Sequence, residues 1–176
     1  MQQHEYTAQF AAWSVLASTM IISADLRGLQ HTQPACLELL TNAEILDVSQ
    51  DIAAHAPNVL FSLSGDDEEN DEAVYTNGAR GGTSRGPVAQ GFSRRMADGS
   101  VAVLLLNRED GRSYHTLSAN WTALGLPSPS HCAVRDLINK ADLPNVTSGS
   151  FSARVAPHSA AFVRISCTNG TAGATT

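Results

Sequence analysis

The chain has 176 residues, of which 43% are hydrophobic and 16% are charged, and its net charge at pH 7 is −6. This length fits one ordinary domain, or one small domain plus part of another, and the apolar content excludes wholesale disorder. The acidic charge argues against nucleic acid and against an anionic membrane surface as partners.

The first fifty residues have the pattern of an α/β protein. Apolar residues in 5–17 recur every three to four positions, which predicts an amphipathic helix. Residues 20–23 form a short apolar run, Met-Ile-Ile-Ser, of the kind found in buried parallel strands. A further helix is expected from Pro34, with several leucines and Ile45 on its inward face. This alternation ends at about Asp51.

After Asp51 the pattern changes to short strands separated by turns. Residues 58–64 have the composition of a strand, whereas 65–86 are acidic, then glycine-rich, and predict a solvated insertion loop. An Asp-Gly turn at 97–100 predicts a hairpin. The other strands are expected at 101–106, 114–120, 134–137, 149–155 and 160–165, followed by a frayed tail at 169–176. This spacing predicts an antiparallel β-sandwich or a Greek-key barrel.

The three cysteines, Cys36, Cys132 and Cys167, lack the spacing of a metal site. The glycine-rich stretch at 80–86 also lacks a phosphate-binding pattern, so we expect neither a metal nor a cofactor. An odd number of cysteines leaves at least one free thiol. Cys132 and Cys167 both fall in strand-like runs, where we expect two buried thiols, with a bridge between them as the alternative.

Three sequons, at Asn120, Asn145 and Asn169, are candidate N-glycosylation sites and hint at a secretory parent protein. The first residues are polar and do not have the basic and apolar regions of a signal peptide, so we expect the chain as written to stay in the cytosol. The apolar stretch at 10–24 is interrupted by serine and threonine and is too short to span a bilayer.

Four motifs mark the strand-rich half: MADGSVAVLLLNR at 96–108, ANWTALGLP at 119–127, AVRDL at 133–137 and GSFSARVAPHSAAFVRI at 149–165. Three more mark the first part: EYTAQFAAW at 5–13, MIISADLR at 20–27 and LELLTNAEILDVSQD at 37–51. In this order and spacing they resemble the C-terminal part of glycoside hydrolase family 27, the α-galactosidases (melibiases). The resemblance covers nearly the whole chain except 65–86.

The resemblance implies a mixed fold. Residues 1–51 would be the last helix, strand and helix of a (β/α)8 barrel, the TIM-barrel fold, and residues 52–168 an antiparallel β-sandwich. The implied parent enzyme hydrolyses terminal α-linked galactose with retention of configuration, which requires two carboxyl groups about 5 Å apart. In this family both catalytic aspartates lie upstream of the matched region. We therefore carry over no catalytic residue and expect the chain alone to be inactive.

The resemblance also implies partners and a location. The partners are an α-galactoside substrate for the parent enzyme and the missing N-terminal half of the barrel. The parent would be secreted, vacuolar or lysosomal. One strand and two helices cannot close a barrel, so we expect the sandwich to fold and the first fifty residues to be only partly ordered.

Asp25 is the carboxylate best placed to lie near an active site. It follows the predicted strand at its carboxyl end, where barrel active sites are built. Asp25 and Arg27 are therefore candidate residues of the active-site rim. The ordinary interpretation is that Asp25 caps or braces the loop together with Arg27.

The other acidic residues have ordinary explanations. Glu38, Glu44 and Asp47 are expected to form a solvated acidic face on the next helix. Asp136 and the preceding Arg135 are expected to be structural rather than chemical.

Several positions depart from the family pattern, and an alternative function stays open. Thr19, Ala24 and Ser49 stand where the family usually has proline, asparagine and asparagine. The alternative to an enzyme part is a free-standing β-sandwich that binds carbohydrate or protein, or a pseudoenzyme. Sugar binding would need exposed aromatic side chains, and the sandwich offers few, among them Tyr114 and Trp121.

Overall fold

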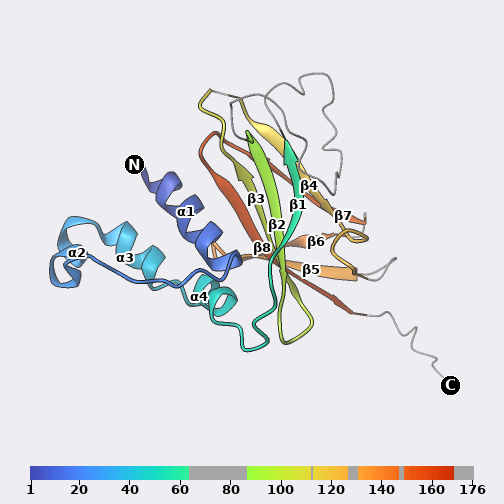
Figure 1. Cartoon of the computed structure of the whole chain (residues 1–176), viewed down its shortest axis with the longest axis horizontal. Coiled ribbons are helices and arrows are strands. Elements are labelled where there is room, and N and C mark those ends of the chain that lie inside the picture. Colours follow the sequence, from blue (N-terminus) through green and yellow to red (C-terminus); the bar gives the residue numbers. More distant parts are fainter. Residues whose placement is uncertain (64–86, 112, 127–130, 147–148, 169–176) are drawn as a thin grey trace.

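The computed structural model describes residues 1–63, 87–111, 113–126, 131–146 and 149–168. In these residues, four helices come first and eight strands follow (Figure 1). The helices are α1 (Gln3–Val15), α2 (Leu26–Thr32), α3 (Pro34–Leu40) and α4 (Ala43–Ser49). The strands are β1 (Asn58–Leu63), β2 (Ala89–Arg95), β3 (Val101–Asn107), β4 (His115–Asn120), β5 (His131–Asp136), β6 (Ala141–Val146), β7 (Ser150–Val155) and β8 (Ala160–Thr168). The predicted insertion loop and tail, 65–86 and 169–176, lie outside the described residues.

The strands form two antiparallel sheets. A larger sheet has the order β1-β2-β3-β8-β5-β6, and a smaller sheet pairs β4 with β7. Helix α1 lies along β3 and β8, while α2 and α3 extend away from the sheets (Figure 1). The predicted antiparallel β-sandwich is thereby confirmed.

Strand β3 is covered on both faces. Val101, Val103 and Leu105 belong to the core between the two sheets. The alternate residues Ala102 and Leu104 belong to a second core beneath the helices. Because side chains of a strand alternate between its faces, a strand buried on both sides has a continuous apolar sequence. This explains the run Val-Ala-Val-Leu-Leu-Leu at 101–106.

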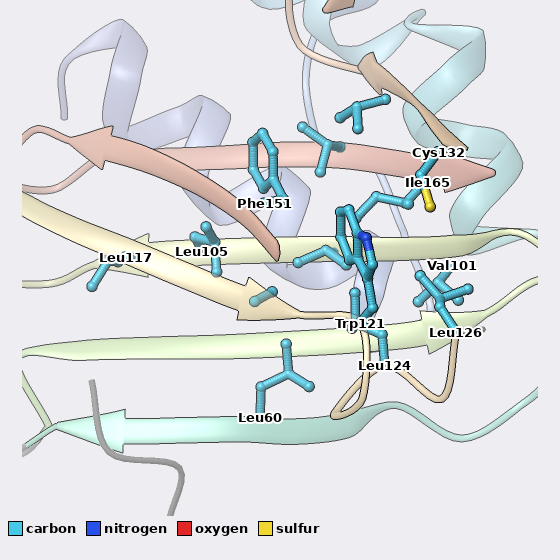
Figure 2. Close-up of a cluster of buried hydrophobic side chains, with 14 of the residues drawn as sticks. Leu60, Val101, Leu105, Leu117, Trp121, Leu124, Leu126, Cys132, Phe151 and Ile165 are labelled. Carbon is cyan, nitrogen blue, oxygen red and sulfur yellow. The ribbon is translucent and has the colours of Figure 1, made fainter. Parts of the chain in front are cut away.

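The main core fills the space between the sheets. Trp121, directly after β4, is 1% exposed and lies among side chains from both sheets (Figure 2). Gly91 in β2 makes room for Phe61, because a Cβ at position 91 would lie 2.4 Å from the Phe61 ring.

The second core joins the helices to the outer face of the larger sheet. It is built from α1, α4, the β2–β3 turn, β3, β8 and the residue after β5. Its buried members are Phe10, Ala11, Val15, Ile45, Val48, Met96, Ala102, Leu104, Leu137 and Phe162. The expectation that the first fifty residues are only partly ordered is therefore wrong for α1 and α4.

The predicted strand at 20–23 is wrong. Among the described residues this segment has no strand partners, and Ile21 and Ile22 are 82% and 50% exposed. A parallel strand requires neighbours on which to form its ladder, and the antiparallel sheets of this chain offer none there. The apolar composition alone could not show this.

Other boundaries differ in ways that local chemistry explains. The helix expected from Pro34 is interrupted after Leu40 and restarts after Asn42, which caps α4. Helix α2 and strand β6 were not predicted. Proline argues against a strand, but β6 tolerates Pro144 because it is an edge strand.

Cys132 and Cys167 form a disulfide, so the expectation of two buried thiols is wrong. The two residues are direct partners across the antiparallel pair of β5 and β8, with Cα atoms 4.1 Å apart. Sequence spacing could not reveal this register. Cys36 on α3 is a free thiol.

Candidate functional site

Helix α4 is fixed to the larger sheet at both ends, and we call this set of contacts the α4 junction. At its start, Asn42 is 3% exposed. The Asn42 Oδ1 atom accepts hydrogen bonds from the backbone N–H groups of Glu44 and Ile45, at 3.1 and 3.3 Å. Its Nδ2 donates to the Leu137 carbonyl at 2.8 Å. One side chain therefore caps the helix and ties it to the end of β5.

A salt bridge continues the α4 junction along the helix. Arg135 on β5 donates from Nε and Nη2 to both carboxylate oxygens of Glu44, at 3.0 and 2.8 Å. Its Nη1 also reaches Asp142 at 3.2 Å. The hydrogen bond from Arg135 lowers the pKa of Glu44 below its ordinary value, against the raising effect of burial. The expectation of a solvated acidic face is thus wrong for Glu44, although Asp47 is exposed.

Arg94 closes the α4 junction at the helix end. Its guanidinium, on β2, is 2% exposed and donates to the carbonyls of Val48 at 2.6 Å and His55 at 2.9 Å. The last carbonyls of a helix lack partners within it and carry partial negative charge, so a cation there is stabilising. Asp51 then accepts from the Ala97 N–H in the β2–β3 turn, at 3.0 Å.

The predicted rim residues Asp25 and Arg27 lie away from the α4 junction, at the start of α2. Asp25 accepts the backbone N–H of Arg27 at 3.1 Å as the helix cap, and its carboxylate lies 3.6 Å from Arg27 Nε. The two side chains are 70% and 97% exposed. This geometry agrees with the capping interpretation, and a role at an active-site rim stays a prediction.

Apolar side chains lie uncovered on the helical part of the chain. Trp13 and Leu16 on and after α1 are 44% and 39% exposed, and Ile21 and Ile22 are more exposed still. We call these four residues the exposed apolar segment.

The sequons differ in how much the structure describes. Asn120 ends β4, is half-buried, and accepts the Ala123 N–H at 2.6 Å through Oδ1. Asn145 lies in β6, but its side chain lies outside the described residues, as does all of Asn169. Glycosylation at the three sites stays a prediction.

The described residues contain no group of three or more His, Cys, Asp or Glu side chains placed to bind a metal. Within the same residues, no helix is long and apolar enough to cross a membrane. Asp136 accepts from the backbone of Ile138 and Asn139 after β5, so it has a structural role, but it does not pair with Arg135. Sequence reasoning missed Arg94 and Asn42, because each depends on a contact with a distant carbonyl.

Comparisons with known proteins identify the sandwich. Residues 88–165 match the family described as the alpha galactosidase C-terminal beta sandwich domain. The chain is 28% identical to alpha-galactosidase 3 of Arabidopsis thaliana and 29% identical to the alpha-galactosidase of Coffea arabica, each over 158 residues. Both matches cover 90% of this chain, and they cover 30% and 34% of those proteins. The chain thus spans about a third of the length of these relatives.

The fold comparison extends over the helices as well. Alpha-galactosidase I from Mortierella vinacea superposes with a TM-score of 0.70 at 23% identity, covering 94% of this chain and 36% of that one. The class is thus an antiparallel β-sandwich domain with helices packed on its outer face. In particular, residues 88–165 match the α-galactosidase C-terminal β-sandwich domain, and the resemblance of the chain to the C-terminal part of glycoside hydrolase family 27 is confirmed.

Proposed function

We propose that this chain is the C-terminal part of an α-galactosidase-like, retaining glycoside hydrolase, and that it supports a catalytic barrel rather than performing the chemistry. The observation that carries this proposal is the sandwich match at 88–165, together with the similarity to about a third of the length of two proteins named alpha-galactosidases. The substrate of the whole enzyme would be an α-galactoside.

The α4 junction supports a division into residues 1–51 as the end of the barrel and residues 52–168 as the sandwich. Hydrogen bonds of Asn42 and Arg94 and the salt bridge of Glu44 hold α4, the last helix, on the larger sheet. The exposed apolar segment lies on the other part of the helical region and would be covered by the missing barrel half. Asp25 and Arg27 would then face the rim of that barrel.

The location that we propose for the parent enzyme is secreted, vacuolar or lysosomal. The disulfide between Cys132 and Cys167 supports an oxidising compartment, because disulfides form and persist there and are rare in the cytosol. The sequons agree with the same route.

An activity assay tests the assignment of the chemistry. We expect purified residues 1–176 to show no turnover of an aryl α-galactoside, because a retaining glycosidase needs two carboxyl groups about 5 Å apart across the glycosidic bond. Turnover above that of a mock purification would overturn this expectation. The matched control is a complete α-galactosidase under the same conditions.

The size of the native protein tests the parentage. An antibody against the sandwich, applied to the source cells and medium, is expected to detect a species at least about twice the 18.6 kDa of this chain. A species of 18.6 kDa alone would favour a separate half-protein instead.

The alternative, a carbohydrate-binding module, rests on Tyr114. Its side chain is 53% exposed, and Arg154 covers one face of the ring at 4.3 Å. Trp121, the other aromatic considered, is buried and cannot stack on a sugar. Chemical-shift changes on adding galactose would support this alternative only if they centre on Tyr114.

A further inference from the structure

The disulfide lies where strand β8 leaves the centre of the larger sheet. Residues 163–165 of β8 pair with β3 on one side and with β5 on the other. In the described sheet, residues 166–168 pair with β5 alone. Their partners are Ala133, Cys132 and His131. The Cys132–Cys167 bond therefore joins β8 to β5 in the part of β8 that no longer pairs with β3.

The two sulfur-bearing residues are unequally accessible. Cys132 is 0% exposed and belongs to the main core, in the same cluster as Trp121 and Ile165 (Figure 2). Cys167 is half-buried and packs against the edge of that core. Because thiol–disulfide exchange needs a thiolate to approach one sulfur atom in line, access decides which sulfur is attacked.

We propose that the Cys132–Cys167 disulfide is a redox-sensitive latch, opened from the Cys167 side. A thiolate of a dithiol reductant attacks Sγ of Cys167, and a mixed disulfide forms as Sγ of Cys132 leaves and takes up a proton. The second thiol of the reductant, as a thiolate, then attacks the first sulfur of the reductant, which is bonded to Sγ of Cys167. Sγ of Cys167 leaves and is protonated. The reductant becomes a cyclic disulfide, and the two cysteines become thiols.

Opening the latch leaves residues 166–168 held to β5 by the ladder alone, whereas residues 163–165 stay paired with both β3 and β5. The stability of the sandwich thus depends on the redox state of its surroundings. A disulfide that closes a loop of 35 residues contributes mainly by restricting the unfolded chain. Its reduction is expected to lower the melting temperature by about 10 °C.

Two single-thiol variants test the direction of attack. In a Cys36→Ser background, Cys132→Ala leaves only Cys167, and Cys167→Ala leaves only Cys132. We expect an aromatic disulfide reagent to label Cys167 at least about tenfold faster than Cys132. Equal rates, or faster labelling of Cys132, would overturn the proposal.

A measurement on the unmodified chain covers the case in which either variant fails to fold. Brief treatment with glutathione, acid quenching and peptide mass mapping are expected to place the mixed disulfide on Cys167. Amide exchange after full reduction with dithiothreitol is expected to speed up at 166–168 and to stay slow in β3. Glutathione on Cys132, or protection lost equally in β3 and at 166–168, would contradict a latch.

Discussion

At the scale of single residues, Arg94 links the two halves of the described chain. Its buried guanidinium is bonded only to backbone carbonyls in the contacts described above, those at the end of α4 and at His55. A lysine could not reproduce these contacts, because its ammonium lacks the forked geometry of a guanidinium. The residue therefore acts as a capping group supplied by a distant strand.

Replacing Arg94 tests this role. We expect Arg94→Met to lower the free energy of unfolding by about 3 kcal/mol, since it removes the charged donor from the buried Val48 carbonyl and from the part-buried carbonyls of Ser49 and His55. The measurement is urea unfolding followed by circular dichroism. The matched control is Arg108→Met, because the Arg108 side chain is exposed and bonds the Gln90 side chain. Its cost is expected within about 0.5 kcal/mol. Equal costs for both variants would contradict the capping role.

At the scale of elements, α4 depends on a salt bridge whose strength changes with pH. The pKa of Glu44 is lowered in the folded chain from the ordinary value of 4.5. The contribution of the Glu44–Arg135 pair is therefore fully present above pH 4.5 and is lost as the pH falls through the lower pKa of the folded state. Both side chains are about one third exposed, at 32% and 35%, so solvent screens the pair.

The variant Glu44→Gln isolates this dependence. At pH 7 we expect it to cost about 1 kcal/mol or less, and at a pH below the folded-state pKa the variant and the original chain should unfold at closely similar urea concentrations. Glu38→Gln is the control, because Glu38 is 75% exposed and lies 3.4 Å from Lys140. A cost for Glu44→Gln that is the same at both pH values would show that the ion pair is not its source.

The elements that sequence patterns predicted correctly are those that are determined by residues close together in the sequence. The hairpin at 97–100 follows from Asp-Gly, with Gly99 at a φ of +83°, and the apolar run of β3 indicated a buried strand. The wrong or missed features have distant causes. A strand at 20–23 would need neighbouring strands to pair with. The disulfide depends on the register of β5 with β8. The α4 junction depends on carbonyls more than forty residues away from Arg94. Residue types do not reveal such contacts.

At the scale of the whole molecule, two hydrophobic cores lie on the two faces of the larger sheet. Ala102, Leu104 and Phe162 are 0% exposed because the helices cover them. If the sandwich folds without the helices, this apolar face is exposed to water. The free-energy cost is about 25 cal/mol for each Å² of apolar surface.

Deleting residues 1–51 measures that cost. We expect the remaining chain to bind the dye ANS and to self-associate in size-exclusion chromatography, because the outer face of β3 and β8 becomes exposed. The full chain under identical buffer conditions is the control. A monomeric truncated chain with an unchanged melting temperature would show that the helices add nothing to the sandwich.

The exposed apolar segment has a consequence for the life of the protein in a cell. Folded proteins with uncovered tryptophan and isoleucine side chains are substrates for chaperones and for degradation, and both processes compete with binding of a partner. When residues 1–176 are produced apart from the rest of the barrel, Trp13, Ile21 and Ile22 therefore make the abundance of this chain depend on the supply of the barrel half that covers them. The steady-state level of such a chain would report the synthesis of that half as much as its own.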